Sequence, residues 1–120
     1  MRFAALLTSL TLTALATTAE ADPPVIEAVK ASQQNGLWRF DVTLSHPDTG
    51  WDHYADGWRV VAPDGTVLGL RVLAHPHVNE QPFTRGLTGV KIPDHLTKVY
   101  IEAKCSRDGW TSLRSEYSLK

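Results

Sequence analysis

Residues able to bind a metal ion or a polar ligand gather in three separated segments of this 120-residue chain, at positions 46–53, 75–77 and 105–110. Their chemically active side chains are His46, Asp52, His53, His75, His77, Cys105 and Asp108. Histidine changes charge near neutral pH and is the commonest metal ligand. These residue types predict a binding site, provided that the fold brings the three segments together.

The His-Pro-His triplet at 75–77 is the first candidate for a metal site. Side chains alternate in an extended segment, so two imidazoles separated by one residue can point the same way. A third ligand, His53 with Asp52 or His46 as alternatives, would complete a site for zinc or copper. The predicted metal ligands are therefore His53, His75 and His77. The only methionine is Met1, which argues against a thioether-rich cuprous site.

Aromatic side chains in the same segments support a different interpretation, a surface that recognises a protein or small ligand of the cell envelope. Aromatic residues are enriched where interfaces gain their energy, and loops at one end of a scaffold commonly carry recognition. The predicted ligand-binding residues are Trp51, Asp52, His53, Tyr54, Asp108 and Trp110. We favour this non-catalytic binding module, with the zinc or copper protein as its alternative. A third interpretation is structural, with Trp51 and Trp110 covering the core.

Enzymatic chemistry and nucleic-acid binding find little support in the sequence. No Gly-x-Ser-x-Gly nucleophile elbow is present. Cys105 ends a strand pattern with inward parity, which suits an inert buried thiol better than a nucleophile. Because it is the only cysteine, no intramolecular disulfide can form, and a dimer linked through Cys105 is a less favoured alternative. The formal net charge is −1 and no basic stripe could follow a phosphate backbone.

The N-terminal segment has the layout of a secretory signal peptide. Arg2 precedes an apolar stretch, and Ala19-Glu20-Ala21 forms a small-x-small cleavage pattern. The stretch is shorter than the roughly 20 apolar residues that cross a membrane, and no cysteine follows the cleavage pattern to carry a lipid. We therefore expect residues 1–21 to be a signal peptide and residues 22–120 to form one domain, periplasmic or secreted, without a membrane span.

Alternating apolar and polar residues predict seven short β-strands and no helix after the signal peptide. Between Leu37 and Ser45 the two kinds of residue occupy opposite parities, as in a half-buried strand. The other expected strands cover 25–32, 58–62, 66–74, 82–92 and 98–105, with a last strand after Asp108-Gly109. This spacing predicts an all-β, antiparallel sandwich of immunoglobulin or fibronectin type III kind, with Trp58 as a core anchor.

Parity and turn residues also predict details of single strands. Gly86 and Gly89 indicate a bulge or bend in the fifth strand. In the fourth strand, Leu68, Leu70 and Val72 are expected to share one face. In the last strand, Leu113, Tyr117 and Leu119 are expected to share one face. The outward residues of the sheets are expected to be Arg39, Asp41, Arg59 and Arg71. If successive strands run up and down, four histidines meet at one end, and His95 lies at the other.

Two runs of sequence resemble a group of small exported proteobacterial proteins. They are WDHYADGW at 51–58 and AHPHVNEQPFTR at 74–85. The likeness covers most of the chain after the expected signal peptide. It implies a sandwich fold and a location in the bacterial envelope or outside the cell, but no activity and no functional residues.

Overall fold

The computed structural model describes residues 3–6, 8–14 and 22–120 of the chain. Arg2 and the expected cleavage pattern at 19–21 lie outside these residues. The described part of the apolar N-terminal stretch has no helix or strand and is exposed to solvent. Among the described residues, no helix has the length and apolar character that a membrane crossing requires.

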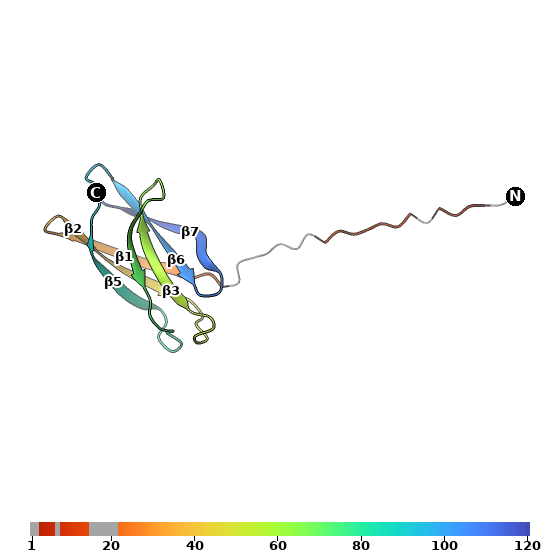
Figure 1. The fold of residues 1–120 in the computed structure, drawn as a ribbon, viewed down its shortest axis with the longest axis horizontal. Coiled ribbons are helices and arrows are strands. Elements are labelled where there is room, and N and C mark those ends of the chain that lie inside the picture. The colour runs from red at the N-terminus through yellow and green to blue at the C-terminus, as the bar shows by residue number, and fades with distance from the viewer. Residues whose placement is uncertain (1–2, 7, 15–21) are drawn as a thin grey trace.

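Seven antiparallel strands form two sheets that pack face to face (Figure 1). The first sheet has three strands in the order β1 (Val25–Gln34), β2 (Leu37–Ser45) and β5 (Phe83–Val90). The second has four strands in the order β4 (Val67–Val72), β3 (Ala55–Val61), β6 (Lys98–Cys105) and β7 (Gly109–Ser118). The predicted all-β sandwich of immunoglobulin-like architecture is confirmed.

The hydrophobic core lies between the sheets and follows the alternation of the sequence. In β2, Phe40, Val42 and Leu44 are buried, while the intervening Arg39 and Asp41 face outward and form an ion pair of 2.8 Å. Trp58 on β3 is 0% exposed, as expected for a core anchor. The partners from β6 are Val99, Ile101 and Ala103. Burial of alternate apolar side chains from both sheets accounts for most of the driving force for folding.

The bulge expected in the fifth strand is present in β5. The pairing register between β2 and β5 shifts between Trp38 and Phe40, whose partners are Val90 and Leu87. Gly89, inside the shifted segment, has a φ of 70°, a conformation that glycine adopts without steric cost.

The expected directions of side chains in β4 are wrong. A register shift between Val60 and Val61 breaks the regular pairing of β3 with β4. Arg71 then pairs with the buried Trp58, and directly opposed residues share a face of the sheet. Arg71 therefore lies on the inner face, whereas Leu70 and Val72 are exposed and only Leu68 packs against the core.

A similar irregularity separates the residues that were expected to share a face in the last strand. The pairing of β6 with β7 shifts between Glu102 and Lys104. Tyr117 and Leu119 pack against the core, but Leu113, which lies inside the shifted segment between Trp110 and Arg114, is exposed.

The three chemically active segments meet at one end of the sandwich, as predicted. The ring centroids of His46 and His53 are 4.7 Å apart, and those of His75 and His77 are 4.5 Å apart. Asp48 joins the two pairs, because its carboxylate accepts hydrogen bonds from the His46 ring and from the backbone of His77. His95 lies in the connection before β6, beside the β3–β4 turn at the opposite end.

Candidate metal centre

His46, His53 and Cys105 form a compact group at the ends of strands from both sheets. His46 directly follows β2, His53 precedes β3, and Cys105 ends β6, where it pairs with Ala55. One possible ligand atom of each residue lies within 4.8 Å of the others. The residues are 3%, 5% and 2% exposed, so the group is closed to bulk solvent.

The two imidazoles of this group each have an unpaired nitrogen. The Nε2 atoms of His46 and His53 are buried and have no hydrogen-bond partner. Leaving a buried polar atom without a partner costs about 1–3 kcal/mol. A metal ion bound between the imidazoles and the thiol would give both atoms a partner, so these residues fit a metal ion.

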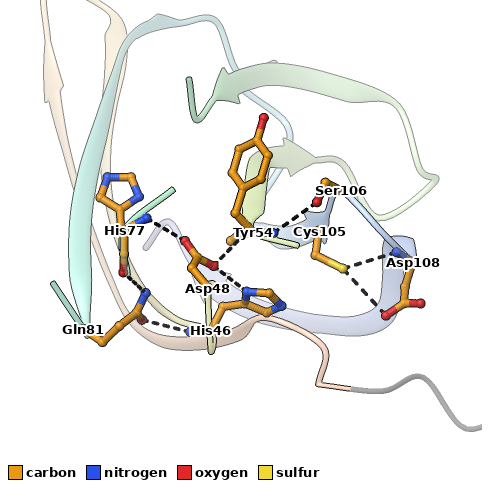
Figure 2. A network of polar contacts seen from close by, with 9 residues as sticks. His46, Asp48, Tyr54, His77, Gln81, Cys105, Ser106 and Asp108 are labelled. Carbon is orange, nitrogen blue, oxygen red and sulfur yellow. Dashed lines mark hydrogen bonds and ion pairs between the residues drawn. The ribbon is translucent and has the colours of Figure 1, made fainter. Parts of the chain in front are cut away.

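Asp48 orients the His46 ring. Its carboxylate, which is fully buried, accepts a hydrogen bond of 2.5 Å from Nδ1 of His46. It also accepts from the backbone N–H of His77 at 2.8 Å (Figure 2), and from the backbone N–H of Ala55 at 2.9 Å. With Nδ1 engaged, Nε2 is the nitrogen of His46 left to coordinate an ion. A carboxylate bound to the far nitrogen of a ligating histidine is the usual outer-shell arrangement of metal sites.

The loop after β6 holds the Cys105 sulfur by hydrogen bonds. The backbone N–H of Asp108 donates to Sγ at 3.3 Å, and the thiol donates to the Asp108 carboxylate at 3.7 Å. The backbone N–H of Tyr54 donates to the Ser106 hydroxyl (Figure 2), and the Ser106 N–H donates to the Tyr54 carbonyl, so two hydrogen bonds connect this loop to the start of β3. Because a thiolate is the metal ligand, binding of an ion would release the thiol proton.

The predicted ligands His75 and His77 lie near this group but do not belong to it. Among the described residues, the His53 ring meets His46 and Cys105, and no metal-binding group includes His75 or His77. His75 is exposed. The His77 ring stacks on Phe83 with centroids 3.9 Å apart, and its Nε2 lies 2.9 Å from a guanidinium nitrogen of Arg85. That hydrogen bond engages Nε2, and the buried Nδ1 has no partner but belongs to no group of metal-binding geometry among the described residues.

The environment of His77 predicts an acid-sensitive titration. Burial lowers the pKa of His77 below its ordinary value of 6.5, and the neighbouring positive charge of Arg85 lowers it further. The unfolded chain therefore binds this proton more readily than the folded protein, so stability is lost as the pH falls below 6.5 toward the folded pKa. We expect NMR titration of the His77 ring to show a midpoint below 6.5.

The Arg85→Gln variant should raise the His77 pKa, because it removes the positive charge beside the ring. The exposed Arg107 supplies the matched control, since Arg107→Gln removes the same charge elsewhere on the surface. A His77 midpoint at or above 6.5 in the unmodified protein would contradict the expected effect of burial.

The residues predicted to bind a ligand do not line one common pocket. Tyr54 and Trp110 line a cleft of about 560 Å³ on the outer face of the four-stranded sheet, together with Arg59 and Lys104. Arg59 stacks on Trp110, with 3.7 Å between the guanidinium carbon and the ring centroid. The remaining predicted residues lie outside this lining: Trp51, Asp52, His53 and Asp108.

Trp51 is 69% exposed, so it does not cover the core as the structural interpretation required. Its ring contacts Tyr54 in an edge-to-face arrangement, with centroids 5.7 Å apart.

Fold and site together define an immunoglobulin-like β-sandwich with a buried group of two histidines and one cysteine. The sequence matches no protein-family profile and no solved structure. It is similar to a protein of Halomicrobium mukohataei described as "Putative lipoprotein", with 36% identity over 86 residues. The match covers 72% of this chain and 42% of that relative, so the chain spans less than half of the relative's length. The relative's description assigns no activity.

Proposed function

We propose that this protein is an exported, non-catalytic binding protein whose ligand is a transition-metal ion, held by His46, His53 and Cys105. The observation that carries the proposal is the pair of buried, unpaired Nε2 atoms beside the buried thiol. Imidazole nitrogen and thiolate sulfur are ligands that zinc and copper prefer. Burial of all three ligands supports a binding role, because a substrate would need access to the ion.

The N-terminal sequence and the relative support a location in the cell envelope. The segment 1–21 has the pattern of a signal peptide, and the similar protein is described as a lipoprotein. A buried cysteine suits an oxidising compartment, because oxidants and other thiols cannot easily reach it. Periplasmic or secreted location therefore remains our proposal for this chain.

A recognition surface is the second candidate function. The observation that favours it is the exposed Trp51, since a large aromatic side chain at 69% exposure is typical of a contact residue. The cleft lined by Tyr54 and Trp110 lies on the outer sheet face and offers a further place for a ligand.

Metal analysis tests the proposal directly. The protein is purified without a histidine tag, stripped with a chelator and titrated with Zn²⁺, Co²⁺ and Cu²⁺. We expect one ion per chain and a higher melting temperature, because a ligand that binds only the folded state stabilises it. Loss of a residue that only hydrogen-bonds to a metal ligand weakens metal binding by roughly 10–100-fold. Cys105 and His53 are proposed as direct ligands, so Cys105→Ala or His53→Ala should weaken binding by at least about 100-fold.

Two control variants separate this site from its alternatives. His95→Ala removes an exposed histidine at the opposite end and should leave stoichiometry and affinity unchanged. The double variant His75→Ala/His77→Ala should retain one bound ion. If the double variant loses the ion while Cys105→Ala keeps it, the ligands are those of the His-Pro-His segment and the proposed centre is wrong.

A further inference from the structure

The candidate metal centre offers three protein ligands rather than four. Among the described residues, His46, His53 and Cys105 are the one group with metal-binding geometry, and the Asp108 carboxylate touches the sulfur without joining it. Structural zinc is almost always bound by four protein ligands, and catalytic zinc keeps its fourth position open to water or substrate. Three buried ligands of the type His₂Cys match neither pattern. They match the trigonal arrangement of electron-transfer copper.

The surroundings of Cys105 would protect a bond between Cu²⁺ and a thiolate. Cupric ions oxidise accessible thiols by joining two of them in a disulfide, and each disulfide leaves two cuprous ions. Cys105 is the only cysteine of the chain and is 2% exposed, so a second thiol cannot reach it. The N–H of Asp108 donates to the sulfur, and such hydrogen bonds tune the potential of copper–thiolate sites.

The ligands are also held in place by the protein before any ion binds. His46 is fixed by the fully buried Asp48, and Cys105 is the last residue of β6, paired with β3. The loops that carry His53 and Asp108 are connected by the two hydrogen bonds between Tyr54 and Ser106. Sites built on rigid elements hold their geometry closely. A fixed set of ligands changes little between two oxidation states, which is what rapid electron transfer requires.

Resting on the proposed metal site, we propose that the bound ion is copper and that the centre accepts and returns single electrons. In the forward step a one-electron donor is oxidised, and Cu²⁺ is reduced to Cu⁺. In the reverse step a one-electron acceptor takes the electron, and Cu⁺ returns to Cu²⁺. The two imidazoles and the Cys105 thiolate stay bound throughout, so no bond breaks and no proton moves.

Anaerobic titration of the purified protein with Cu²⁺ tests this inference. We expect an intense visible absorption from thiolate-to-copper charge transfer that reaches its maximum at one ion per chain. Ascorbate, as the electron donor, should bleach the band, and ferricyanide, as the acceptor, should restore it through repeated cycles without release of copper. Cys105→Ser should lose the band entirely, while the surface variant His95→Ala should keep it.

The outcomes distinguish this inference from the proposed function on which it rests. Tight binding of Zn²⁺ with no charge-transfer band from Cu²⁺ would overturn the copper assignment but leave the metal centre intact. A band that decays irreversibly, with oxidation of Cys105, would also overturn the redox role. Failure to bind any of the ions would overturn both. If Cys105→Ser does not fold, Asp108→Pro, which removes the N–H bonded to sulfur, should still shift the potential or the band.

Discussion

Replacing Asp48 with alanine is expected to destabilise the protein by at least about 3 kcal/mol, because it leaves three buried donors without a partner and each costs about 1–3 kcal/mol. The carboxylate is fully buried and accepts hydrogen bonds from the His46 ring and from two backbone N–H groups. All three donors would lose their partner in the same cavity. The same variant should weaken metal binding roughly 10–100-fold, because Asp48 no longer orients His46.

Urea unfolding and metal titration measure the two effects of this change. Asp41→Ala is the matched control, because Asp41 is a partly exposed carboxylate whose ion pair with Arg39 lies on the outer sheet face. Exposed ion pairs contribute about 0–1 kcal/mol, so this control should unfold close to the unmodified protein. An Asp48→Ala variant as stable as the Asp41→Ala variant would show that the buried network contributes little.

Truncating Trp58 to alanine should cost about 3–5 kcal/mol, the range for removing a large aromatic side chain from a core. Trp58 is 0% exposed between the two sheets, and its surroundings in β2 and β6 are held by strand pairing. The side chains around Trp58 can therefore only partly fill the cavity that the alanine substitution leaves. Equilibrium denaturation of the variant gives the free energy of unfolding directly.

Trp58→Phe should cost much less than Trp58→Ala, for a reason specific to this site. The indole N–H of Trp58 is buried without a hydrogen-bond partner, so phenylalanine removes an unsatisfied donor while filling most of the volume. Trp51→Ala provides a surface control and should change stability by less than about 0.5 kcal/mol. Equal losses for the phenylalanine and alanine variants would show that the indole nitrogen contributes to stability.

The fold was predictable where a strand alternates without interruption. The run from Leu37 to Ser45 and the run from Lys98 to Cys105 both match their burial in the structure. The directions of Arg71 and Leu113 were not predictable, because bulges change the parity within β4 and β7. A bulge forms where two residues of one strand lie opposite one residue of its partner. The position of a bulge therefore depends on the pairing of two strands and cannot be predicted from the alternation within one of them.

The sequence predicted which end of the sandwich carries the candidate site. It predicted only in part which histidines come together there. His53 was expected to bind a metal, and the structure joins it to His46 and Cys105 rather than to the His-Pro-His segment. A local signal was available: His46 and Cys105 each continue the inward parity of their strand. The His77 ring instead stacks on Phe83 and contacts Arg85, which both belong to β5. The spacing of residues 75–77 cannot predict contacts with another strand.

The side chains of Gln81 and Asp48 connect the segment around His46 to the segment around His77, which lies about 30 residues later in the chain. The Gln81 amide accepts from the His46 N–H and donates to the His77 carbonyl, while Asp48 accepts from the His77 N–H (Figure 2). An ion that immobilises the His46 ring would therefore also restrain local opening of the surface segment at 77–81. Metal binding at the buried site would then reduce the mobility of this surface segment. A partner that binds the segment would therefore bind the metal-loaded and metal-free forms with different affinity.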